Sequence, residues 1–507
     1  MSQEADPVEA GTSTRIRSSA ACDGCRARKV KCVFKSDQAK CTTCVDLNIA
    51  CLKIQPRKKR GPKNRYVRAL QSQLDGETCF ENLQPLDLGK QNALGSPYSP
   101  AAPLSLLDIA PRDLLDQILT DWFGWIHPVA PILHRGQFMA RIDEAWTTGD
   151  ISSSFSILVA SICAATVASI RRRRPLYGTV SVDGCLEYAE RLGLWNRANA
   201  ITLEWSLAMY NFSSATNLEN GQHSPACCRL GAEATIAVKY LLYHEMDRMS
   251  FMDQQILKRL YCLLYAGQCT GDMFGGHGII LHPAHENIQS LLPLEASDED
   301  LLRGVYEGGA PDQSPNASSS TTPSYVPGLN ALARLFSIWQ SSQATSTRTI
   351  SRLQEHIDRT QHILDELPPE LSWNPSSRSL STTQSFVSDF GTDVQTVNLK
   401  VSQLHIRANL LEQMHALART ENMLLTPSII LEERHRVVNE LLDVLYNASY
   451  EVFDANGYSI VPKIRDIGST LLDEIRSGEA SHGTTLQASV NLDRLLAKLE
   501  DLDVVPM

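Results

Sequence analysis

The sequence predicts two parts of different kinds: a small zinc-organised N-terminal module and a large all-α domain. Two observations lead to this prediction. Six cysteines fall between Cys22 and Cys51 in a repeated spacing, and nearly every apolar segment after residue 106 has helical rather than alternating periodicity. The chain of 507 residues is 43% hydrophobic, which is enough to bury a large core in the second part.

The first 21 residues are polar, so we expect a disordered lead with no secretion signal. The region 22–51 then repeats one spacing, with two and then six residues between cysteines: Cys22, Cys25, Cys32 and again Cys41, Cys44, Cys51. Six thiolates complete two tetrahedral zinc sites only if two sulfurs each bind both metals. The symmetric partition makes Cys22 and Cys41 the shared ligands of two zinc ions. A disulfide framework would need an oxidising compartment, which nothing in the lead indicates.

Positive charge is confined to the first half of this module. Four cations stand between Cys25 and Cys32: Arg26, Arg28, Lys29 and Lys31. The matching interval of the second half has no cation and one acid, Asp46. A short helix beginning near Cys25 would add the positive end of its dipole. The first half is therefore predicted to meet a polyanion, and the second half to serve as its structural mate.

The stretch with CRARKVKC resembles the fungal zinc binuclear cluster transcription factors, a DNA-binding class with this cysteine spacing. The resemblance implies that Lys29 reads a C/G-rich triplet in the major groove. It implies base and phosphate contacts for Arg28 and Lys31, and a backbone contact for Arg26. Lysine and arginine are the usual donors to guanine, so the chemistry fits. A zinc module that binds protein or senses a ligand without reading bases is the alternative.

Residues 52–74 are predicted to form a basic arm and a short helix. The arm holds five cations broken by a Gly-Pro pair, namely Arg57, Lys58, Lys59, Arg60 and Lys63. Such a run fits contact with the DNA backbone and a nuclear import signal, so we expect a nuclear protein that uses the import machinery. The charge balance agrees, because residues 1–68 carry 16 basic and six acidic residues while the whole chain has a net charge of −10.

The arm is followed by barely one heptad, Val67, Leu70 and Leu74, which leaves open whether the protein is a homodimer or a monomer. Residues 75–105 are rich in Gly, Pro, Asn and Ser and are predicted to be a linker. The other seven cysteines show no ligand spacing and fit reduced, mostly buried thiols.

Residues 106–507 are predicted to form the all-helical domain. Its opening resembles the fungal-specific middle homology regulatory domain, with an aromatic helix from about Arg112 to Phe123 followed by His127-Pro128 and a Pro-Ile-Leu-His segment ending at His134. No carboxylate or nucleophile pattern accompanies the two histidines, so turn and packing roles are favoured. No catalytic residues are predicted, and the protein is not expected to be an enzyme.

The segment Phe155–Ile170 is apolar, but its sixteen residues include four hydroxyls and are too few to span a membrane. It is predicted to be a central core helix, with no membrane association. The four arginines that follow, Arg171 to Arg174, are predicted to be a solvated or acid-paired patch, with a second import signal as the less favoured hypothesis.

Helices are predicted through the rest of the chain, among them one from about Val397 to Arg419 and one from about Ser428 to Val452. Disordered insertions rich in Ser, Thr and Pro are predicted near 296–328 and 372–396. The last piece, LDRLLAKLEDLDVV, is interpreted either as a packed terminal helix or as a short acidic activation segment. The sequence as a whole predicts a sequence-specific regulator of RNA polymerase II genes, a pathway-specific activator of a metabolic or secondary-metabolite gene set. It does not indicate the target genes, the sign of regulation, the inducer or the half-site spacing.

Overall fold

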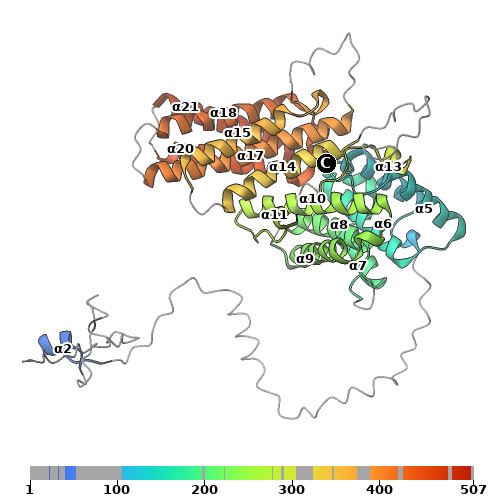
Figure 1. Cartoon of the computed structure of the whole chain (residues 1–507), viewed down its shortest axis with the longest axis horizontal. Helices are drawn as coiled ribbons and strands as arrows, with labels where there is room; N and C mark the ends of the chain where they lie inside the picture. Colours follow the sequence, from blue (N-terminus) through green and yellow to red (C-terminus); the bar gives the residue numbers. More distant parts are fainter. Residues whose placement is uncertain are drawn as a thin grey trace, which may run out of the picture. The chain divides into compact units, whose positions relative to one another are not determined.

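The computed structural model describes residues 22, 25, 32, 40–52, 105–196, 200–221, 223–276, 278–286, 291–303, 324–344, 348–373, 389–420, 426–477 and 482–503. The chain divides into two compact units, Met1–Pro100 and Ala101–Met507. In these residues the regular elements are all helical and no strand occurs, as the sequence predicts. The N-terminal unit contributes one short helix, α2 (Thr42–Asp46), to the described part (Figure 1).

The first half of the larger unit runs from residue 105 to residue 303. Its helices are η1 (Leu106–Asp108), α4 (Arg112–Asp121), η2 (Trp122–Ile126), α5 (Arg135–Thr148), α6 (Ser153–Ser169), η3 (Arg171–Tyr177), α7 (Val182–Arg191), α8 (Leu203–Asn220), α9 (Pro225–Tyr240), η4 (Leu241–Glu245), η5 (Met246–Arg248), α10 (Phe251–Met273), α11 (Pro283–Glu286) and α13 (Asp298–Arg303). The coloured ribbon shows α6 to α10 gathered in one group (Figure 1).

Local sequence explains where many of these helices begin. A Ser or Thr precedes the first turn, and its side-chain oxygen accepts a hydrogen bond from the backbone N–H three residues later. This occurs at Ser152, Ser181, Thr202, Ser224, Ser250 and Thr349. Each cap satisfies a backbone N–H that has no partner within the first turn, and so favours a helix start at that residue.

The core of the first half is α6, the apolar segment predicted to be a central helix. Almost all of its residues are buried, and it packs against α7 and α8. Small residues such as Ala160 and Ala164 let the neighbours approach closely, and the buried hydroxyls of Ser161 and Thr166 bond to backbone carbonyls of the same helix. A helix that is apolar on all sides is stable only when it is enclosed, and α6 is.

No single helix in the described ranges is long and apolar enough to cross a membrane. Only α5 and α6 pass such a test together, and they are bent by 119° at the break between them.

The second half is organised around α17 (Phe390–Thr420), which is buried along most of its 31 residues. The other helices are α14 (Val326–Ala344), α15 (Ile350–Asp365), η6 (Pro369–Leu371), α18 (Thr426–Asn447), α19 (Tyr450–Asn456), η7 (Gly457–Ser459), α20 (Val461–Ser477) and α21 (His482–Asp503). Helices α14, α15, α18, α19 and α20 pack on α17, while α21 packs on α18, α19 and α20. Helix α14 also packs on α10 and so joins the two halves.

The four arginines after α6 are paired with acids and carbonyls. Arg173 lies 3.1 Å from Asp121 of α4, and Arg174 lies 2.8 Å from Glu219 of α8. Arg171 donates to the carbonyl of Leu218 at 2.8 Å. Arg172 pairs with an acid of the second half. The prediction of an acid-paired patch is confirmed for this run.

Both predicted insertions are too wide. Asp298 to Arg303 forms α13, where buried Leu301 and the Arg259–Asp298 ion pair hold it, and α14 already begins at Val326. At the second insertion α17 begins at Phe390, seven residues earlier than predicted, with Val394 fully buried. Both stretches are polar and were therefore predicted to be disordered. They are helical because tertiary packing stabilises α13 and the first turns of α17. Residues 304–323 and 374–388 lie outside the described residues.

The single helix predicted from Ser428 to Val452 is two helices, α18 and α19. The break falls at Ala448 and Ser449, where the extended backbone of Ser449 starts the second helix.

Candidate metal centre

Four buried thiols meet in the N-terminal unit. The sulfurs of Cys22, Cys25, Cys41 and Cys44 all lie within 4.8 Å of one another. The Sγ–Sγ distance is 3.7 Å between Cys22 and Cys41, 3.5 Å between Cys22 and Cys44, and 3.5 Å between Cys25 and Cys41. A disulfide would bring two sulfurs to about 2.05 Å, so none of these contacts is a disulfide.

The two remaining cysteines occupy matching places in the two halves. The backbone N–H of Cys22 lies 3.5 Å from the sulfur of Cys32, and that of Cys41 lies 3.4 Å from the sulfur of Cys51. Exchanging the first, second and third cysteines of one half with those of the other reproduces every one of these contacts. The six cysteines therefore have an approximate twofold arrangement, with Cys22 and Cys41 nearest its centre.

In the second half of the cysteine cluster, local backbone structure positions the sulfurs of Cys41 and Cys44. Cys41 is the N-cap of α2, so that Cys44 lies one turn later on the same side of the helix. The chain then reverses at Asn48, whose φ of +48° is tolerated by asparagine, and Ile49 donates from its backbone N–H to the carbonyl of Cys44 at 3.0 Å. This turn brings Cys51 back to the cluster, against which Ile49 also packs.

The arrangement fits zinc. Four sulfurs at about 2.3 Å from a tetrahedral zinc lie about 3.8 Å apart, close to the distances between these thiols. The N–H of Cys25 lowers the pKa of Cys22 to about 6, whereas withdrawal from water raises the pKa of Cys25. Thiolates packed this closely repel one another, and divalent cations would allow all of them to ionise together.

The predicted DNA contacts Arg26, Arg28, Lys29 and Lys31 lie outside the described residues. The same holds for the arm, Arg57, Lys58, Lys59, Arg60 and Lys63, and for the heptad Val67, Leu70 and Leu74.

The two histidines singled out in the sequence analysis, His127 and His134, have the packing roles predicted for them. His127 donates from Nε2 to the carbonyl of Leu133 at 2.9 Å, and burial lowers its pKa to about 4. Nδ1 of His134 accepts a hydrogen bond from the N–H of Gln137 at 3.1 Å and so caps α5. The described cysteines of this unit form no disulfide, and four of them, Cys163, Cys185, Cys262 and Cys269, are buried.

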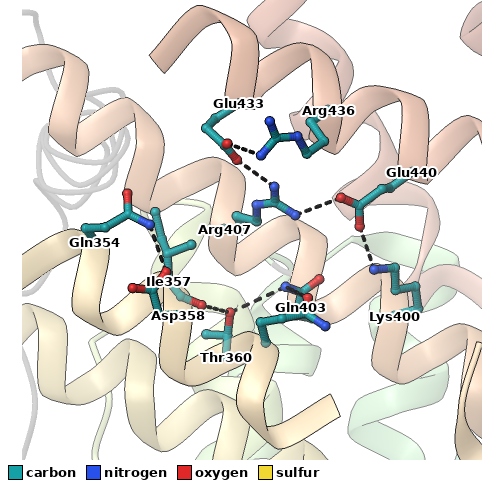
Figure 2. A network of polar contacts seen from close by, with 11 residues as sticks. Gln354, Ile357, Asp358, Thr360, Lys400, Gln403, Arg407, Glu433, Arg436 and Glu440 are labelled. Carbon is teal, nitrogen blue, oxygen red and sulfur yellow. Dashed lines mark hydrogen bonds and ion pairs between the residues drawn. The ribbon is translucent and has the colours of Figure 1, made fainter. Parts of the chain in front are cut away.

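Sequence reasoning missed a charged network at the interface of α17 and α18. Figure 2 shows Arg407 between two carboxylates of α18, with N–O distances of 2.7 Å to Glu433 and 2.9 Å to Glu440. Lys400 approaches the other oxygen of Glu440 at 2.6 Å, and Arg436 pairs with Glu433. The spacing of Lys400 and Arg407, one heptad apart, was the available signal, but the partners come from another helix.

Residues 20–61 match the fungal Zn(2)-Cys(6) binuclear cluster domain. This match covers all six cysteines of the sulfur cluster. The N-terminal module is a fungal Zn(2)-Cys(6) binuclear cluster domain. The prediction of this family from the cysteine spacing is thereby confirmed, and with it the prediction of two zinc ions.

Curated proteins similar to this chain carry the names of fungal regulators. Maltose fermentation regulatory protein MAL33 of Saccharomyces cerevisiae is 24% identical over 251 residues, which are 48% of each chain. Azaphilone cluster-specific transcription factor azaR of Aspergillus niger is 27% identical over 133 residues, 24% of this chain and 28% of azaR. Citrinin biosynthesis transcriptional activator mrl3 of Monascus ruber is 37% identical over 68 residues, 13% of each chain. The chain spans about half the length of MAL33 in this match.

Proposed function

We propose that this protein is a sequence-specific DNA-binding regulator of transcription that works in the nucleus. The observation that carries the proposal is the twofold sulfur arrangement within a fungal Zn(2)-Cys(6) domain. A module of this size has too few apolar residues for a core of its own. Zinc binding would therefore supply most of its folding energy and hold the basic segment in shape.

We assign Cys22 and Cys41 as the shared zinc ligands. Their sulfurs touch each other, and each also touches the second cysteine of the opposite half, as a ligand common to two metals must. Cys25 and Cys32 would complete one site, and Cys44 and Cys51 the other. When bound, the ions neutralise four of the six thiolate charges and fix the fold of the module.

We assign the reading of DNA bases to the first half of the zinc cluster domain, on chemical grounds. Lys29 is proposed to read a C/G-rich triplet, with Arg28 and Lys31 supporting it and Arg26 on the phosphate backbone, because ammonium and guanidinium groups match the acceptors of guanine. The arm from Arg57 to Lys63 would add affinity that does not depend on base sequence, and would serve nuclear import.

The larger unit is proposed to regulate the output of the zinc cluster domain. Names of similar proteins refer to maltose fermentation, azaphilones and citrinin, so a pathway-specific activator of a metabolic or secondary-metabolite gene set is the function we favour.

Binding measurements on the full-length, zinc-loaded protein test the proposal. Lys29→Ala should weaken binding to a duplex with a C/G triplet by about tenfold to a hundredfold, while binding to a random duplex changes by less than about threefold. The control is Lys40→Ala, an exposed cation of the same module outside the basic run. If Lys29→Ala weakens both duplexes equally, the module does not read bases, and a zinc-stabilised protein-interaction or ligand-sensing role is favoured.

A second measurement concerns the arm. Replacing Arg57, Lys58, Lys59 and Arg60 with glutamine should reduce affinity for every duplex and flatten the dependence of log K on log salt by roughly three to four. The same variant should accumulate outside the nucleus. An unchanged slope and location would remove both roles from the arm.

A further inference from the structure

Arg172 connects the two halves of the larger unit. It belongs to η3, directly after the core helix α6, yet its contacts are with residues near the C-terminus. Its guanidinium pairs with Asp454 of α19 at 3.2 Å, lies 5.1 Å from the ring centroid of Tyr450, and donates to the backbone carbonyl of Asp501 at 2.7 Å. One side chain thus contacts both α19 and the last turn of α21.

The carbonyl of Asp501 is one that the helix cannot satisfy itself. The last four carbonyls of an α-helix have no partner within the helix, and a cation there also offsets the negative end of the dipole. Arg172 therefore caps α21 from a distant segment. Tyr450 assists, since its hydroxyl donates to the carboxylate of Asp501 at 3.2 Å and accepts from Lys498 at 3.1 Å.

Helix α19, which carries Asp454 and Tyr450, is anchored in the core. In α19, Val452, Phe453 and Ala455 are buried, and buried Asn456 donates to the carbonyl of Val394 in α17 at 2.9 Å. The N-terminal part of α21 is also anchored, through buried Ala488, Asn491 and Leu495. Loss of the Arg172 contacts would thus act on the part of α21 beyond Leu495.

The final segment of α21, Leu496–Asp503, is different in character and is here called the α21 tail. Its leucines recur at every third position, and they range from buried Leu499 through half-buried Leu502 to exposed Leu496, which is 46% exposed. Glu500 and Asp501 are exposed beside them. An acidic amphipathic helix of this kind suits a protein groove that is apolar inside and basic at its rim.

We propose that the α21 tail is a partner-docking segment that Arg172 holds closed. Release of the Arg172 and Tyr450 contacts frees the tail, and its leucines and acids then bind an apolar groove with basic edges on another protein. This inference rests on the proposed function, because the partner would be a protein recruited to the regulator on DNA. It accounts for both interpretations of the C-terminal piece, as packed helix and as acidic segment.

The chain supplies its own matched control. Arg174 lies two residues away in the same turn and is also paired, but its partner is Glu219 of α8, within the first half. A general loss of positive charge or of η3 structure would affect Arg172→Ala and Arg174→Ala alike. Only the first should change the α21 tail.

Hydrogen exchange on the full-length protein tests the closed state. In Arg172→Ala, amides of the α21 tail should exchange roughly tenfold faster or more, while those of α6 and α17 are unchanged. Tyr450→Phe keeps the ring under the guanidinium and should give a smaller acceleration in the same amides. Unchanged exchange of the tail in both variants, or equal acceleration in Arg174→Ala, would overturn the proposal.

A reporter measurement tests the open state. The full-length chain is fused to a heterologous DNA-binding module and tethered upstream of a reporter gene, so that output does not depend on DNA binding by the zinc cluster domain. Arg172→Ala should raise output several-fold, and Arg172→Ala combined with Leu499→Asp should return it to the wild-type level. Equal output in the wild type and Arg172→Ala, or a gain that survives Leu499→Asp, would refute tail docking even if native DNA reading is correct.

Discussion

The two units of this protein are stabilised in different ways. In the N-terminal unit, the buried residues that the structure describes are all cysteines, and they surround no aliphatic core. The larger unit has an extended aliphatic and aromatic core in which the described cysteines are ordinary small apolar residues. The stability of the N-terminal unit is thus expected to depend on bound zinc, and that of the larger unit on the burial of apolar side chains. A change that perturbs one unit should therefore leave the other as its reference.

Removal of zinc is expected to have the largest effect. A strong chelator should unfold the zinc cluster domain, because metal binding of this kind supplies on the order of 10–16 kcal/mol. DNA binding should disappear, while the helical signal and melting temperature of the larger unit stay as they were. Circular dichroism and duplex binding, before and after zinc is restored, measure both. A chelator that melts the larger unit as well would contradict the division.

Single cysteine substitutions sharpen the same point within the zinc cluster domain. If Cys22 is shared by two ions, Cys22→Ala damages both sites, and metal analysis should find close to no zinc per chain. Cys32→Ala damages one site, so at least one ion should remain. Equal zinc content in the two variants would refute the assignment of Cys22 as a shared ligand.

A substitution that creates a cavity in the aliphatic core should destabilise the larger unit and leave the zinc cluster domain intact. Phe212 of α8 is fully buried among apolar side chains, and Phe212→Ala should destabilise the larger unit by about 3–5 kcal/mol. Zinc content and the affinity for a C/G-triplet duplex should be unchanged, provided the protein is assayed well below its melting temperature. Loss of zinc in this variant would show that the units do not fold independently.

Breaking the charged network of Figure 2 should destabilise the larger unit about as much as the cavity at Phe212. Arg407→Ala would leave Glu433 without its buried partner and Glu440 with Lys400 alone, and should cost about 3–5 kcal/mol by urea unfolding. Arg436 pairs with the same Glu433 but its side chain is 60% exposed, so Arg436→Ala should cost less than about 1 kcal/mol. Comparable losses in the two variants would mean that burial does not decide the strength of these pairs.

Replacing Lys463 should have a smaller effect than replacing Phe212 or Arg407, and one of the opposite sign. This buried ammonium donates to the hydroxyl of Ser402 at 2.8 Å, and no carboxylate of the described chain forms an ion pair with it. Replacement by methionine should therefore stabilise the larger unit by about 1–3 kcal/mol near pH 7.

The same lysine predicts a dependence on pH. Burial lowers the pKa of Lys463 from 10.5 to about 8, so between these values the unfolded chain holds a proton that the folded protein has lost. Stability of the wild type should rise with pH across this window relative to Lys463→Met, because the unfolded state binds more protons. A constant difference between the two proteins from pH 8 to 10.5 would contradict this prediction.

Sequence reasoning succeeded where a pattern is local. The spacing of six cysteines predicted the zinc cluster family, and the helical periodicity of the apolar residues predicted most helices within a few residues. It failed where distant segments meet. Nothing near Arg172 indicates Asp501, and nothing near Arg407 indicates Glu433, because both partners are set by tertiary packing. For the same reason the helical starts at Asp298 and Phe390 were taken for loops.

The twofold arrangement of the sulfurs has a consequence for how such a module can diversify. Because each half supplies an equivalent set of ligands, the residues between ligands can change in one half without altering the metal framework. A chain with the basic interval moved from the first half to the second would keep both ions and a nucleic-acid surface. Because the two halves are related by an approximate twofold, the second half would then face the duplex. The chain after the module would leave the DNA in the opposite direction.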